Sequence, residues 1–204
     1  MFFRLIAILA FGISTASPSN AHSPLPGIEG FYVGLLDPFR AVPQLLALGG
    51  LALLVSGFQT VRIPVLCGLF LVAALVGVVF GATLPHPSTA LLFCAALAGL
   101  WASFLPGRFV PVAGALVLAT GVYLGTISIP DPGPHTARVV TVSGSLVGLN
   151  VGLIYLAGGI LMMKDKFAAA VFGRVSRFAG LILGCAAIIV LVQGSVPLQA
   201  PPES

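Results

Sequence analysis

The chain has 204 residues, of which 58% are hydrophobic and only 7% are charged, and its mean hydropathy is +1.14. So few charged side chains cannot cover the surface of a water-soluble domain of this size, which excludes that class. Basic residues near lipid headgroups account for the net charge of +4, so we predict no nucleic-acid partner. The composition indicates an integral membrane protein whose main partner is the lipid bilayer.

The first 21 residues have the pattern of a secretory signal peptide. Arg4 gives a basic start, Leu5–Ile13 is a short apolar run, and a Ser-Asn-Ala sequence ends at Ala21. Because the run is too short to span a bilayer comfortably, we interpret residues 1–21 as cleaved; a retained anchor is the alternative. Cleavage after Ala21 would leave His22 as the first residue, on the outer side of the membrane.

Residues 22–194 contain six long apolar stretches. A hydrocarbon core about 30 Å thick needs roughly 20 apolar residues per helix, and lipid offers no partner to an open sheet edge. We therefore predict an all-α, polytopic transmembrane bundle of about six helices, with residues 195–204 as a disordered, proline-rich outer tail. The expected spans are Val42–Phe58 (after an apolar lead-in, Ile28–Phe39), Val61–Thr83, Ser88–Leu105, Phe109–Ile129, Val139–Met163 and Phe178–Gln193.

Basic residues gather on alternate connections between these spans. With the N-terminus outside, six lie on inner connections: Arg62, Arg108, Lys164, Lys166, Arg174 and Arg177. The outer segments hold Arg138 and Arg40. The positive-inside rule and the signal peptide then agree on a multi-pass protein of the bacterial inner membrane.

The inner segment Lys164–Arg177 combines four basic residues with the apolar run Phe167–Phe172. Two interpretations fit this pattern. It could lie on the inner leaflet as an amphipathic helix, or it could be an early start of the sixth span.

Glycines recur every four residues in several spans. Residues four apart share one helix face, so each series forms a groove that another backbone can approach closely. The groove can serve packing within the bundle or formation of a homo-oligomer. The candidate packing residues are Gly121, Gly125, Gly144, Gly148 and Gly152.

Few polar side chains fall at membrane depth, and three are candidates for a transport path. Asp37 precedes the first full span beside Pro38, and an acid next to a broken helix can form a cation site. Alternatively, Asp37 caps the following helix and pairs with Arg40. Gln44 lies about one turn further on. Asn150 lies within the fifth span and would either form an interhelical hydrogen bond or act as a ligand.

Two segments resemble the opening of the HupE/UreJ family. They are Gly30–Phe39, with the sequence GFYVGLLDPF, and Leu45–Leu51, with the sequence LLALGGL. The Ala21-His22 junction and the turn Gly81–Pro85 are also similar to the family pattern. The resemblance implies a small polytopic protein linked to hydrogenase or urease maturation, with nickel or cobalt as a permease substrate.

The chain departs from that family at the metal ligands. In the motif His-Pro-x-x-Gly-x-Asp-His, Asp37 takes the position of the first histidine and Gln44 that of the second. The later pattern His-Gly-x-x-His-Gly falls on Thr120–Gly125, which keeps the glycines and lacks both histidines. Because Ni²⁺ favours imidazole nitrogen, the family's histidine path cannot be transferred to this chain.

The histidines of this chain all fall on the outer side in the predicted topology. His22 with its free amine, Glu29, His86 and His135 (with Asp131 nearby) could together collect a metal ion there. Solvated loop residues are the alternative, because each lies in a different segment.

We predict no enzyme, since no nucleophile, nucleotide or haem motif occurs. Two functions remain. The first is a divergent permease for nickel or another small cation or solute. The second is a non-transporting accessory or scaffold protein that has lost the metal ligands.

Overall fold

The computed structural model describes residues 30–80, 87–128, 135–167 and 169–195. The predicted signal peptide and nearly all of the predicted tail lie outside these ranges. The described elements, in chain order, are α2 (Phe31–Leu36), the 3₁₀ helix η1 (Asp37–Phe39), α3 (Val42–Ser56), η2 (Thr60–Arg62), α4 (Ile63–Phe80), α5 (Pro87–Phe104), α6 (Val110–Ile127), α7 (His135–Lys166) and α8 (Ala169–Ser195).

Five of the described helices are long and apolar enough to cross a bilayer, namely the ones from α4 to α8. The segments Phe31–Phe39 and Val42–Ser56 are bent by 73° relative to each other and pass the same test together, so the described helices make six crossings if this pair is one span. The predicted all-helical membrane bundle is confirmed, and the chain is an integral multi-pass membrane protein in contact with lipid.

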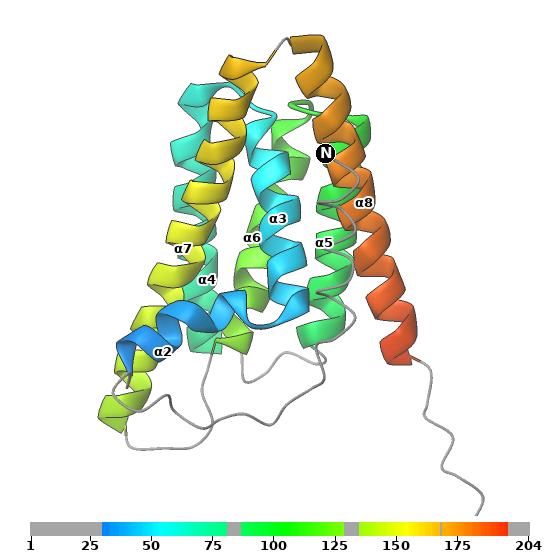
Figure 1. Cartoon of the computed structure of the whole chain (residues 1–204). Coiled ribbons are helices and arrows are strands. Elements are labelled where there is room, and N and C mark those ends of the chain that lie inside the picture. The colour runs from blue at the N-terminus through cyan, green and yellow to red at the C-terminus, as the bar shows by residue number, and fades with distance from the viewer. Residues whose placement is uncertain (1–29, 81–86, 129–134, 168, 196–204) are drawn as a thin grey trace, which may run out of the picture.

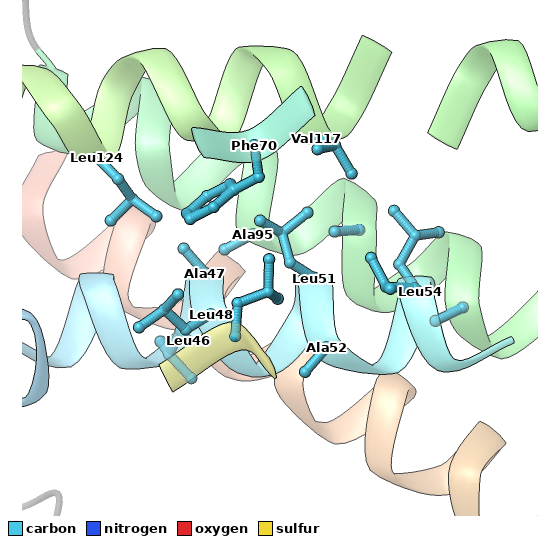
Figure 2. Close-up of a cluster of buried hydrophobic side chains, with 14 of the residues drawn as sticks. Leu46, Ala47, Leu48, Leu51, Ala52, Leu54, Phe70, Ala95, Val117 and Leu124 are labelled. Carbon is cyan, nitrogen blue, oxygen red and sulfur yellow. The ribbon is translucent and has the colours of Figure 1, made fainter. Parts of the chain in front are cut away.

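The centre of the bundle is α3, which α5, α7 and α8 contact most extensively and α6 and α4 touch as well (Figure 1). Its side chains are buried around most of its circumference: Ala47, Leu48, Leu51 and Val55 are fully covered. Figure 2 shows these leucines packed toward Phe70 of α4 and other apolar side chains. A helix that is apolar all round is typical of such an enclosed position.

The outer surface of the bundle is also apolar. Helix α4 exposes Val72 and Val79, and α8 exposes Ile182 and Ile189. In water such a surface would drive aggregation, whereas hydrocarbon solvates it. The outer faces are therefore lipid-facing surfaces.

Glycines allow close backbone contact in the two most extensive helix pairs. In α4 and α6, a methyl group at Gly121 would lie 2.7 Å from the Ala73 Cβ, and one at Gly125 would overlap the Ala74 carbonyl oxygen. In α5 and α8, a methyl group at Gly99 would lie 2.8 Å from the Gly180 carbonyl oxygen. Because real Cβ atoms essentially never approach so closely, only glycine allows these backbones to touch.

The structure decides between the two interpretations of Lys164–Arg177. Helix α7 continues to Lys166, and α8 is helical from Ala169 onward. The basic segment therefore forms the end of one long helix and the first turns of the next, so the early start of the sixth span is correct. At 27 residues, α8 extends about 40 Å, which exceeds the hydrocarbon core.

Candidate functional site

The most unusual backbone feature of the bundle is the bend in its first span. Helix α2 passes into η1 at Asp37, and the chain turns at Ala41, whose φ of −98° and ψ of 126° are extended. Pro38 lies in η1 and Pro43 in the first turn of α3. Each proline lacks a backbone donor, so the two together favour short helices separated by a break.

Helix α2 lies across one end of the bundle (Figure 1) and packs against the glycine face of α7. A methyl group at Gly144 would be 3.0 Å from the Leu35 nitrogen, and one at Gly148 would overlap the Leu35 carbonyl oxygen. One at Gly152 would lie 2.7 Å from the Phe39 ring. These three glycines form a groove, the α7 groove, which is filled by α2 and η1 of the same chain.

Asp37 is half-buried and begins η1 at the bend. Its backbone carbonyl accepts a hydrogen bond of 3.0 Å from the Arg40 nitrogen. The N-cap position of α3 is Ala41, which makes no side-chain cap bond, so Asp37 does not occupy the N-cap of that helix. Its predicted pairing with Arg40 stays a prediction. Asp37 is held at the bend by the contacts of α2 and η1 with α7.

Gln44 lies near Asp37 in the fold but in a different environment. Its side chain is only 5% exposed, in the first turn of α3. Since η1 and α3 contact each other, Asp37 and Gln44 belong to one region around the bend. A buried amide there supplies both a donor and an acceptor within an otherwise apolar interior.

Asn150 does not join this region. It lies two residues from Gly148 and Gly152, or about 200° around the axis of α7, so it is on the side away from α2. Its side-chain nitrogen donates to the Leu146 carbonyl oxygen of the same helix at 2.9 Å. The expected interhelical bond is thus corrected to a bond within α7. Asp37 and Gln44 therefore lie on the two sides of the bend, and Asn150 lies apart from it.

The predicted outer metal site falls largely beyond the described residues. His22, Glu29 and His86 lie outside them, and so does Asp131. His135 is the first residue of α7, and its side chain is also outside the description. In the part of the chain that the structure describes, no three His, Cys, Asp or Glu residues are grouped so that they could hold a metal ion. The outer site stays a prediction.

Three cavities lie at the opposite end of the bundle, where α3 and α5 end, α7 ends and α8 begins. We call this the basic end, because Arg62, Arg108, Lys164, Lys166, Arg174 and Arg177 belong to its connections and helix ends. Asp37, Gln44 and Asn150 line none of these three cavities. The sequence shows that the segment Lys164–Arg177 is basic. It gives no sign of the cavities beside this segment, because they depend on how α8 packs against α3 and α7.

No family model, curated protein or solved structure matches this chain. The fold defines its class, a polytopic helical membrane protein with a bent first span. Its relation to the HupE/UreJ family stays a prediction that depends on the motif segments.

Proposed function

We propose that the protein is a divergent permease of the HupE/UreJ type, which carries a small cation past the bend in the first span. The observation that carries this proposal is the 73° bend between Phe31–Phe39 and Val42–Ser56, with Asp37 at the break. Discontinuous helices hold the substrate sites of many transporters, because their free backbone carbonyls and helix ends can coordinate ions. The segment that resembles the family, Gly30–Leu51, spans this bend.

The side chains at the bend limit which cations the proposed permease would bind well. A carboxylate at Asp37 and an amide at Gln44 offer oxygen donors, where the family motif has imidazole nitrogens. Oxygen ligands suit harder cations and hold Ni²⁺ less tightly than histidine does. The proposed permease would therefore carry nickel or cobalt with low affinity, or a harder divalent cation in preference.

A second candidate, the accessory or scaffold protein, is supported by a different observation. Asn150 faces away from the bend, and the centre of the bundle is filled by the apolar side chains of α3. A protein that only binds partners in the membrane needs no polar path through its centre, and the apolar centre of this bundle suits such a function.

Uptake of radioactive nickel and cobalt in a bacterial host without its own nickel importers separates these functions. We expect uptake above the empty-vector level, lowered about tenfold or more by Asp37→Asn, because losing one ionic ligand costs at least the free energy of a tenfold change. Asp165→Asn is the matched control, since Asp165 is an exposed carboxylate in the last turn of α7 at the basic end.

Each outcome has a definite meaning once membrane insertion of every variant is verified. Uptake that survives Asp37→Asn would place the path away from the bend. No uptake of nickel, cobalt, manganese or magnesium by the intact protein would reject the permease and favour the accessory function.

A further inference from the structure

The three cavities at the basic end adjoin one another around the first turns of α8, and we call them together the hollow, with a polar part, an apolar part and a third cavity beside them. The polar part, about 270 Å³, is lined by Lys164 and Arg177. The apolar part, about 220 Å³, lies between α7 and α8 and shares Phe172 and Ser176 with the polar part. A third cavity of about 380 Å³ adjoins through Arg177 and includes Arg174.

The polar part is strongly cationic. At the basic end, Asp165 is the one carboxylate among the described residues, against six Lys and Arg side chains. Lys164 and Arg177 both line this cavity and are both exposed, so a ligand can reach them from outside the bundle. Two cations that converge on one cavity form a site for an anion, and guanidinium binds phosphate oxygens in a bidentate manner.

The apolar part distinguishes a lipid from a soluble anion. Its lining is nearly all hydrocarbon, including Met163, Phe167 and Val171, with Ser176 as the polar exception. The Ser176 hydroxyl already donates to the Gly173 carbonyl oxygen at 3.2 Å. An ion alone would leave this part unfilled, whereas an acyl chain would suit its hydrocarbon lining.

The height of the hollow also fits a lipid headgroup. The uninterrupted apolar stretch of α8 begins at Phe178, directly after Arg177, so Arg174 and Arg177 lie near the end of the span that is Val171–Gln193. Basic pockets between helices at the cytoplasmic face are known to hold acidic headgroups. We propose that this hollow binds one anionic phospholipid, with its phosphate at Lys164 and Arg177 and an acyl chain between α7 and α8.

A first experiment tests whether the hollow recognises the charge of the headgroup. The purified full chain in detergent is mixed with lipid, and bound lipid is measured by native mass spectrometry. We expect phosphatidylglycerol to be retained in preference to phosphatidylcholine, and Arg177→Gln to lower its retention about fivefold, as expected for one basic residue near a headgroup. The double variant with Lys164→Gln should lower retention further. Arg62→Gln, which removes an exposed cation of the same end that lines none of the three cavities, should have no effect.

A steric test places the lipid inside the hollow. Gly173 lines the polar part, and a methyl group added to it would meet no atom within 4 Å, so Gly173→Leu can fold and fill the space. Gly68→Leu is the matched control, because Gly68 is exposed on α4 and equally unobstructed. We expect Gly173→Leu to reduce phosphatidylglycerol retention and Gly68→Leu to leave it unchanged.

Four results would overturn the proposal. Equal retention of the two lipids would show that charge is not recognised, and an equal effect of Arg62→Gln would show general attraction to a cationic surface. Full retention in Gly173→Leu would put the lipid elsewhere. If inorganic phosphate competes fully and phosphatidylglycerol gains nothing from its acyl chains, the polar part is a site for a free anion.

Discussion

Buried hydroxyl groups show how single residues adapt to the dry interior of this bundle. Most donate to a carbonyl three or four residues earlier in their own helix, which satisfies the hydroxyl without any partner helix. The bonds are Ser56 to Leu53, Ser103 to Gly99, Thr120 to Leu116 and Ser128 to Leu124, at 2.7 to 2.9 Å. Ser145 differs: its oxygen is buried, and within the described structure it has no hydrogen-bond partner.

Replacing Ser145 by alanine should therefore stabilise the protein. The variant Ser145→Ala removes an unpaired buried oxygen, and we expect a gain of about 1 kcal/mol in the free energy of unfolding. The matched variant Ser103→Ala removes a bonded hydroxyl and should cost about 0.6 to 1 kcal/mol. Thermal unfolding in detergent, followed by circular dichroism, compares the two. A lower melting temperature for Ser145→Ala would mean that the hydroxyl binds a water molecule or a substrate.

At the scale of the element, the α7 groove decides where the bent first span lies. Gly148 offers a direct test, since a side chain there would collide with the Leu35 carbonyl. We expect Gly148→Leu to displace α2 and to cost about 3 kcal/mol or more, because a backbone cannot yield as a flexible side chain does. Gly159→Leu, on the same helix in open space, should be nearly neutral.

The same pair of variants tests the alternative use of this glycine face. The melting temperature would be measured by thermal unfolding and the oligomeric state by native mass spectrometry, for both variants. If Gly148→Leu split an oligomer and left the melting temperature of the monomer unchanged, the face would be an interface between copies of the chain, contrary to its occupation by α2.

Sequence reasoning predicted the elements better than their partners. Pro38 indicates a broken helix before the first full span, and the four-residue spacing of Gly144, Gly148 and Gly152 indicates a groove. Neither pattern predicts that α2 packs into the groove, since small residues indicate only that some other backbone comes close. Asn150 was misjudged for a related reason: an amide at membrane depth needs a partner, and its own helix can supply one.

For the whole molecule, hydropathy predicts how many helices cross the bilayer but not how they are arranged. Lipid is as apolar as leucine, so an apolar helix face gains nothing specific by facing protein. The central helix illustrates this: α3 has only 15 residues, about 22 Å, and its composition resembles that of the lipid-facing helices. The cavities at the basic end follow from that arrangement, and the sequence carries no direct signal for them.

The orientation of the bundle is the last prediction. In the described structure, the basic end holds six Lys and Arg residues, whereas Arg40 lies near the bend at the other end, so the positive-inside rule places the basic end in the cytoplasm. Single cysteines at two exposed positions, Gln59 and Gln193, report on the two ends in a background without Cys67, Cys94 and Cys185. A thiol reagent that cannot cross membranes should label Gln193→Cys in intact cells and Gln59→Cys only after permeabilisation. The reverse labelling would invert the bundle, place the bend on the cytoplasmic side, and move the proposed lipid site to the outer leaflet.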